Sequence, residues 1–400
     1  MADSKISALA SGAPAQAGDE YIVARSGANY KLTGAEVAAG SVANFSNGLF
    51  FRNRIINGDM RIAQRGTAAV TADGSFPVDR FKVSQSTDGA FSAQQDTSVP
   101  TGFVNSVKIT PTTADATLTT TQNLNLSQFI EGTNIGDLAW GTANARAVTL
   151  SFWVRSSLTG TFGGSLRNGA LDRSYAFTYS ISAADTWEYK AVTIAGDTSG
   201  TWLTTTGIGI NVVFGLGAGP DRSGTAGAWA GANYVAATGA VSVIGTLNAT
   251  WYVTGVQLET GSVATPFERR PYGTELMLCQ RYYEKSYAQE TVPGTTGNLG
   301  NGFVGNCTAL AASTAGNVSG ISILPFKVTK RAAPTMVAYA FDGTANAVTQ
   351  LALPNRTGVT GFANVRDTGA FQFMSFDSSS ATAIAANSNL SFSWTAAAEL

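Results

Sequence analysis

The chain has 400 residues, enough for roughly two to four domains and for a sizeable hydrophobic core. Only 13% of the residues are charged, and 25 basic against 26 acidic residues give a net charge of -1, so the sequence lacks the basic surface that neutralises nucleic-acid phosphates. There is no histidine, which excludes Ser-His-Asp triads, histidine-ligated metals and imidazole proton transfer.

Residues 1–45 are rich in Gly, Ala and Ser and differ from the rest of the chain. We expect short extended pieces at Glu20–Ala24 and Tyr30–Leu32, then a short helix over Gly34–Ala39 with Thr33 as its cap. This segment holds too little apolar material for a core of its own, so we expect it to dock on a partner. It has no signal peptide, and the chain has no run of about 18 apolar residues, so we expect synthesis in the cytoplasm without membrane insertion.

Residues 46–272 read as a series of strands. Val148–Arg155 alternates, with Val148, Leu150, Phe152 and Val154 on one face and Thr149, Ser151, Trp153 and Arg155 on the other. The same pattern predicts strands over Tyr175–Ile181, Ile208–Phe214 and Trp251–Leu258. Turn signals separate them at intervals that suit a β-sandwich.

A helix is predicted over Thr274–Ser286, with Thr274 as its cap and apolar residues at a spacing of three or four. Cys279 lies in this stretch and is expected to be a buried free thiol, a small hydrophobe in the core. Prolines before and after the helix suggest a domain junction. We therefore divide the chain into an N-terminal segment 1–45, a sandwich 46–272, a linker helix 273–286 and a C-terminal domain 287–400.

The C-terminal domain is expected to be a second, smaller β-sandwich. The strands predicted in it are Val304–Leu310, Ile321–Val328, Thr335–Phe341, Phe371–Phe376 and Asn389–Trp394. The predicted fold class is all-β, with one short helix between two sandwiches.

The tryptophans are the most informative candidates for a binding site. Trp153 shares a polar strand face with Arg155, an arrangement in which a flat ring stacks on a sugar and the guanidinium bonds its oxygens. Trp202 and Trp229 lie in Gly-rich loops, where they could contact a partner or fold back on the rim. The alternative for Trp153 is packing under a covering loop or against a second subunit. Trp187 is expected to start a strand as part of the core.

Signals for catalysis and for cofactors are weak. Carboxylates alone suffice for glycoside hydrolysis, but each candidate also suits a turn or a solvated edge: Asp172, Asp185, Glu188, Asp197, Asp221 and Glu259. The Gly-rich segments lack the strand-to-helix context of nucleotide loops, and no calcium-loop motif occurs. We therefore predict a non-enzymatic protein without a cofactor.

Several segments resemble bacteriophage tail-fibre and receptor-binding proteins. The most specific are Gly-Val-Gln-Leu-Glu at 255–259 and Cys-Gln-Arg-Tyr-Tyr-Glu-Lys at 279–285. The others are Lys5–Leu9, Ala17–Val23, Lys31–Thr33, Asn53–Gly66, Val78–Phe81, Ser151–Arg155, Thr186–Lys190, Gly196–Trp202, Ala264–Leu276 and Phe392–Leu400. The central domain also resembles the jelly-roll carbohydrate-binding modules of polysaccharide-degrading enzymes.

The resemblance implies a homotrimeric virion tail fibre. Residues 1–45 would anchor it to other tail or capsid proteins, and the central jelly roll would attach to a host-surface polysaccharide, with Trp153 as its stacking platform. Some carbohydrate-binding modules hold a structural calcium, for which this sequence shows no motif. The alternative is a purely structural virion component, such as a head fibre, baseplate or decoration protein, whose aromatic residues are used in subunit contacts.

Overall fold

The computed structural model describes residues 20–25, 28–33, 51–297, 303–306, 318–350, 359–365, 368–376 and 389–400. The chain divides into two compact units, Met1–Arg52 and Asn53–Leu400. In the first, β1 (Glu20–Arg25) pairs with β2 (Ala28–Thr33) as an antiparallel ribbon, which confirms both predicted extended pieces. The helix predicted over Gly34–Ala39 lies outside the described residues.

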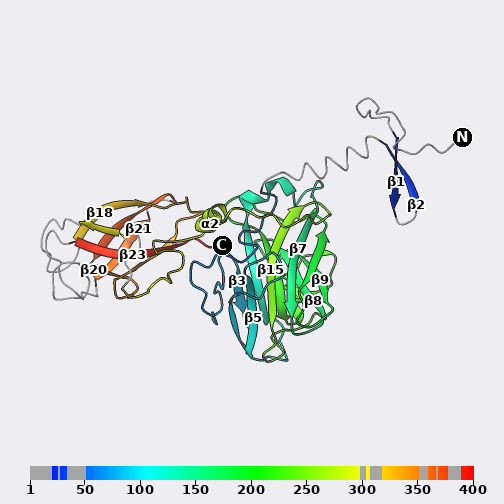
Figure 1. Cartoon of the computed structure of the whole chain (residues 1–400), viewed down its shortest axis with the longest axis horizontal. Helices are drawn as coiled ribbons and strands as arrows, with labels where there is room; N and C mark the ends of the chain where they lie inside the picture. Colours follow the sequence, from blue (N-terminus) through cyan, green and yellow to red (C-terminus); the bar gives the residue numbers. More distant parts are fainter. Residues whose placement is uncertain are drawn as a thin grey trace. The chain divides into compact units, whose positions relative to one another are not determined.

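The second unit contains a β-sandwich of two antiparallel sheets, which Figure 1 shows in cyan and green. In spatial order, the five-stranded sheet consists of β10 (Glu188–Ile194), β7 (Val148–Ser156), β15 (Trp251–Thr260), β5 (Ser106–Thr113) and β4 (Ala90–Asp96). The six-stranded sheet consists of β13 (Trp229–Ala230), β9 (Ser174–Ile181), β8 (Gly160–Arg167), β11 (Ile208–Ala218), β6 (Asn123–Glu131) and β3 (Lys82–Gln85). All four strands predicted between residues 148 and 258 are confirmed.

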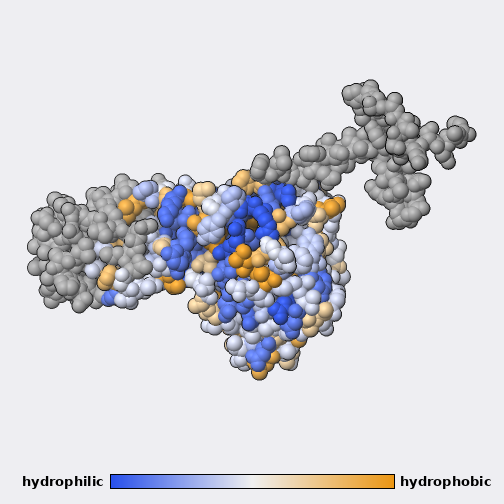
Figure 2. Space-filling view, in the orientation of Figure 1, coloured by the Kyte–Doolittle hydropathy of each residue, from blue (hydrophilic) through white to orange (hydrophobic). Residues whose placement is uncertain are grey.

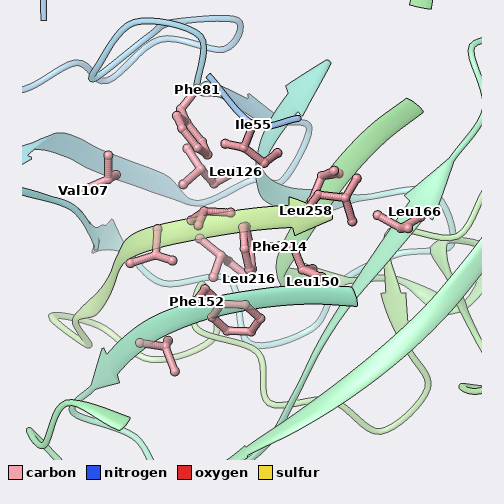
Figure 3. Packing of buried hydrophobic residues seen from close by; sticks show 14 of the residues in the cluster. Ile55, Phe81, Val107, Leu126, Leu150, Phe152, Leu166, Phe214, Leu216 and Leu258 are labelled. Atoms are coloured by element: carbon pink, nitrogen blue, oxygen red, sulfur yellow. The ribbon is translucent and has the colours of Figure 1, made fainter. Parts of the chain in front are cut away.

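The core lies between the two sheets, because each sheet turns one apolar face inward. Val148, Leu150, Phe152 and Val154 of β7 are all fully buried, as their alternation predicts. The Phe152 ring packs edge-to-face on Phe214 of the facing sheet, with ring centroids 5.0 Å apart. Figure 3 shows this packing. The all-β jelly-roll fold is thus confirmed.

Short elements connect the strands. They are the 3₁₀ turns Gly132–Asn134, Gly136–Leu138 and Pro220–Arg222, and the parallel pair β12 (Ser223–Gly224) and β14 (Ala236–Ala237). No helix among the described residues is long and apolar enough to cross a membrane. On the face that Figure 2 shows, hydrophobic residues of the described part form small patches among hydrophilic ones.

The predicted helix 274–286 is wrong at both ends. Helix α2 runs from Tyr272 to Gln280 and begins after Pro271, so Thr274 lies inside its first turn and caps nothing. Tyr283–Lys285 instead forms strand β16, which pairs with Thr395–Ala397 and is buried. Tertiary pairing with a strand more than 100 residues away overrides the helical spacing here. Cys279 is a buried free thiol in α2, as expected.

The C-terminal strands form a second, smaller β structure, drawn from yellow to red in Figure 1. After β16 (Tyr283–Lys285) come β17 (Phe303–Asn306), β18 (Val318–Pro325), β19 (Thr335–Tyr339), β20 (Ala347–Gln350), β21 (Val359–Val365), β22 (Ala370–Phe376) and β23 (Asn389–Ala397). Strand β23 is central, because its first half pairs with β17 and β20 and its second half with β16 and β19. Residues 307–310 of one predicted strand, including Cys307, lie outside the described residues. The predicted domain boundaries after residues 45 and 286 stay predictions.

Charged side chains join the C-terminal strands to the jelly roll. Arg281 makes a two-pronged ion pair with the buried carboxylate of Glu131, at 2.6 and 2.8 Å. Arg80 pairs with Glu399 and stacks on the ring of Tyr282, its guanidinium carbon 3.5 Å from the ring centroid. Because Glu131 and Arg80 are buried, loss of either partner, Arg281 or Glu399, would leave a buried charge uncompensated.

Candidate functional site: an aromatic groove on the five-stranded sheet

A groove of about 530 Å³ lies on the outer face of the five-stranded sheet. Its volume is in the range of about 300–1,000 Å³ that small-molecule sites occupy. The lining residues come from β7, β10 and β15, from the loop before β5, and from the segment after β15. They are Phe103, Ser151, Trp153, Tyr189, Gly255, Ala264, Thr265, Pro266, Phe267 and Arg269.

Trp153 and Tyr189 form one wall. They are direct cross-strand partners on β7 and β10, and their ring centroids are 5.6 Å apart. Because β10 is an edge strand, Tyr189 is 46% exposed, whereas Trp153 is half-buried. Neither the Trp153 indole N–H nor the Tyr189 hydroxyl has a hydrogen-bond partner among the described residues. The pair therefore offers two ring surfaces and two free polar groups.

A bulge in β15 shapes the floor. The register of β15 against β7 shifts between Thr254 and Gln257, and Gly255 in this bulge has a φ of +63°. A Cβ on Gly255 would lie 2.7 Å from the Phe103 ring and 3.2 Å from the Trp153 ring. Only glycine allows both this backbone conformation and the close approach of the two rings.

The opposite wall is the segment 264–269, which two buried side chains of β15 hold in place. The Glu259 carboxylate accepts hydrogen bonds from the Thr265 N–H at 2.8 Å and the Thr265 hydroxyl at 2.6 Å. Gln257 accepts a bond from the Glu268 N–H at 2.8 Å and donates one to Glu259 at 2.8 Å. These bonds fix the backbone on both sides of Pro266 and Phe267. The Gly-Val-Gln-Leu-Glu motif thus builds this wall.

Phe103, Phe267 and Arg269 close one end of the groove. The two phenylalanine rings meet edge-to-face with centroids 5.3 Å apart. The Arg269 guanidinium carbon lies 4.7 Å from the Phe103 centroid and 5.6 Å from that of Phe267. Contacts of this kind orient a guanidinium while leaving its N–H groups free to bond.

The structure places Arg155 beside the groove and not in its lining. Its guanidinium donates to the Asp185 carbonyl at 2.9 Å and to the Ser98 hydroxyl at 2.8 Å, and it pairs with the Asp185 carboxylate at 3.1 Å. It also lies 5.0 Å from the Tyr252 ring centroid. A sugar-binding role for Arg155 stays a prediction.

Trp202 and Trp229 lie together in a different place, where they form an edge-to-face cluster with Trp140. The three centroid distances are 4.6, 5.3 and 5.3 Å. Trp140 and Trp202 are 6% and 7% exposed. Each indole N–H donates to a backbone carbonyl: Trp140 to that of Arg146, Trp202 to that of Ser199, and Trp229 to that of Ala195. Of the two alternatives for the loop tryptophans, the structure shows folding back; their role in glycan binding stays a prediction.

The prediction that Trp187 starts a strand in the core is wrong. Trp187 precedes β10 and is only half-buried, packing on Tyr252 with a centroid distance of 6.1 Å. Trp187 is not fully covered because it precedes an edge strand, which has a neighbouring strand on one side only.

Sequence reasoning missed Tyr189, Phe103, Phe267 and Arg269. No local signal indicated Tyr189, which shares its strand face with Ala191 and Thr193, and only the strand pairing brings it to Trp153. Phe267 and Arg269 lie in the segment 264–276 that carries the family resemblance, without any periodicity that indicates a surface role.

The lining of the groove contains no carboxylate. Glu188 lies on the face of β10 opposite to Tyr189, and its pKa is lowered: burial raises the pKa, but hydrogen bonds from Lys190 and from the backbone of Ala183 and Ser182 outweigh it. A general acid needs the opposite shift. Within the described residues, no cluster of three or more acidic or cysteine side chains could hold a metal ion. What the groove offers is ring surfaces and unpartnered hydrogen-bonding groups.

No protein-family model matches the chain, and no curated protein matches it significantly. Solved structures that resemble it include the enzymatically active domain of tailspike protein 4 of bacteriophage CBA120, with 13% identity, 52% of this chain and 22% of that chain covered, and a TM-score of 0.27. A putative sugar binding protein from Bacteroides thetaiotaomicron matches with 12% identity over 52% of this chain and 100% of that chain, at a TM-score of 0.29.

The carbohydrate-binding module TmCBM61, solved with β-1,4-galactotriose, matches with 11% identity over 53% of this chain and 100% of the module, at a TM-score of 0.27. The match to the tailspike domain spans about a fifth of that chain. Likenesses this distant carry no weight for function, which has to rest on the groove itself.

Proposed function

We propose that this chain is a subunit of a homotrimeric bacteriophage attachment fibre that binds a bacterial surface glycan in the Trp153 groove. The observation that carries the glycan-binding part is the pair of rings, Trp153 and Tyr189, which face a groove of sugar-compatible size with their polar groups unpartnered. Aromatic faces that stack on sugar C–H groups, beside free hydrogen-bonding groups, are what a glycan site requires.

The virion part of the proposal is supported by the tail-fibre-like segments spread along the sequence. Residues 1–45 would dock on the particle, and the protein would be assembled in the host cytoplasm and located in the virion. Weak single-site affinities near the millimolar range become effective when three copies in a fibre act together, because linkage raises the effective concentration. The role proposed is non-catalytic.

The test is retention of fluorescently labelled full-length protein on washed cells from a panel of bacterial strains. We expect saturable retention on at least one strain and its loss after periodate oxidation of the surface glycans. Absence of retention on every strain would contradict the proposal and favour a structural virion component. Release of reducing ends from the bound polysaccharide would instead indicate an enzyme.

A matched pair of variants locates the site. Tyr189 and Tyr272 are 46% and 45% exposed, but only Tyr189 lines the groove. Tyr189→Ala should reduce retention at least tenfold, and Tyr272→Ala should leave it unchanged. Light scattering on each variant measures the oligomer, expected to be a trimer in both. If Tyr189→Ala lost both the trimer and its retention on cells, the result would favour the structural alternative.

A further inference from the structure

The groove carries a single charge, and it is positive. Of its ten lining residues only Arg269 is charged, and the others are aromatic, small, or neutral and polar. The carboxylates of the adjoining segment face elsewhere: Glu259 is buried beneath the wall and bonded to Thr265, and Glu268 accepts from the Asn53 N–H at 2.8 Å. A ligand in the groove therefore meets a cation that these carboxylates do not neutralise.

Arg269 is also unpaired in its own right. Among the described residues it has no ion pair and no hydrogen-bond acceptor, and its interactions are the two ring contacts with Phe103 and Phe267. Its neighbour Arg270 shows the contrast, because that guanidinium is buried and bound to the Glu275 carboxylate at 3.2 Å and to the backbone carbonyl of Ile55 at 3.1 Å. Of two consecutive arginines, one holds the fold together and the other faces the groove.

From these observations we propose that the groove is selective for an acidic glycan, whose anionic substituent pairs with the Arg269 guanidinium while a neighbouring sugar stacks on Trp153. The inference rests on the proposed glycan-binding function. A guanidinium pairs with carboxylate, sulfate or phosphate oxygens through two parallel N–H bonds. The ring contacts hold its plane before the ligand arrives, which reduces the entropy lost on binding. With a net charge of -1, the chain as a whole exerts little repulsion on a polyanion.

The experiment compares wild type with Tyr189→Ala and with three arginine variants on a glycan array that holds neutral oligosaccharides and their uronic-acid, sialylated, sulfated and phosphorylated counterparts. Arg269→Gln removes the charge, and Arg269→Lys keeps it but loses the planar fork. Arg146→Gln is the matched control, since Arg146 is an exposed arginine, 55% exposed at its side chain, that does not line the groove.

We expect wild type to prefer acidic members at least tenfold over their neutral counterparts. Arg269→Gln should abolish this preference, Arg269→Lys should weaken it, and Arg146→Gln should leave it unchanged. The preference should also decline as NaCl is raised, because salt screens the ion pair. The acidic members that bind identify which anionic group is recognised.

Two other outcomes separate the inference from the function on which it rests. Equal binding of neutral and acidic glycans by wild type and Arg269→Gln, with loss in Tyr189→Ala, would overturn the acidic selectivity and leave the glycan site standing. Failure of wild type to bind any glycan at high micromolar protein would overturn both.

Discussion

Two groups of aromatic residues in this jelly roll differ in what they leave available. Trp140, Trp202 and Trp229 contact one another edge-to-face and give every indole N–H to a backbone carbonyl. Trp153 and Tyr189 also contact one another, with ring centroids 5.6 Å apart, but leave their polar groups unpartnered and one side open to the groove. Only the second group therefore keeps polar groups and ring surface available for contact with a ligand.

The comparison shows that the position of a tryptophan in a loop or in a strand does not indicate whether its ring is exposed. Trp202 lies in a Gly-rich loop, which favours a surface position, yet it is 7% exposed because its loop folds over Trp140. Trp153 lies in the middle of β7, an interior strand of the sheet, yet part of its ring faces the groove. A tryptophan is available to a ligand when neighbouring residues leave its indole N–H without a hydrogen-bond partner and leave part of its ring uncovered.

The largest expected effect comes from exchanging the two tryptophans for alanine. Trp202→Ala should lower the free energy of unfolding by about 3–5 kcal/mol, because it opens a cavity in a packed cluster. Trp153→Ala should cost clearly less stability but lower glycan affinity at least tenfold, or about 1.4 kcal/mol. Urea unfolding and cell retention measure the two quantities. If Trp202→Ala abolished retention while remaining fully stable, the cluster would be a binding site after all.

Asp79 gives a pH-dependent test at the junction with the C-terminal strands. Burial raises the pKa of Asp79 to about 6, with Glu399 adding to the rise and Arg65 and Gln64 opposing it. The pKa of Asp79 is higher in the folded than in the unfolded protein. Protonation of Asp79 therefore contributes fully to folding stability below about pH 4, and this contribution is lost as the pH rises through 6. The loss is about 3 kcal/mol for a shift of about two pKa units.

The measurement for Asp79 is the urea midpoint of wild type and Asp79→Asn between about pH 4 and pH 7. The difference between the two curves should change with pH in favour of the variant as the pH rises. Asp79→Asn also changes the hydrogen bond that the Gln64 side chain donates to Asp79 at 2.5 Å. The prediction therefore concerns how the difference between the curves changes with pH, and not the stability of the variant at one pH. Parallel curves would show that Asp79 titrates normally.

Gly255→Ala tests the floor of the groove. The new Cβ would meet the Phe103 ring at 2.7 Å, and a φ of +63° is unfavourable for alanine. We expect a loss of about 1–2 kcal/mol in stability and a loss of glycan retention, because Phe103 and Trp153 must move. Gly239→Ala is the control: Gly239 also has a positive φ of +79°, but a Cβ there meets nothing within 4 Å. If both variants lost retention equally, backbone strain would explain the loss, and the geometry of the groove would not.

The smallest effect is expected for Arg155→Gln. The Arg155 guanidinium is engaged by Asp185 and Ser98 and does not line the groove. Glycan affinity should change less than about twofold, by the conversion of affinity to free energy. A tenfold loss in the same retention assay would place the sugar over Arg155, as the sequence predicts.

The fold was largely predictable because alternation of apolar and polar residues reports which strand face is buried. This holds for β7, whose four apolar residues are all in the core. The prediction from helical spacing failed for Tyr283–Lys285. The spacing continues past Gln280, but these residues form a strand because they pair with β23. A local pattern cannot report a partner more than 100 residues away.

The sequence alone determined the all-β class, the lack of histidine chemistry and the position of Trp153 on the outer face of its strand, because these depend on composition and period. Only the tertiary structure decided that Tyr189, Phe267 and Arg269 join Trp153 in one groove, and that Trp202 and Trp229 fold back. Those outcomes depend on strand pairing, on the bulge at Gly255 and on the hydrogen bonds of Gln257 and Glu259 to the segment above them. Contacts between residues distant in the chain are fixed by packing, and no local pattern encodes them.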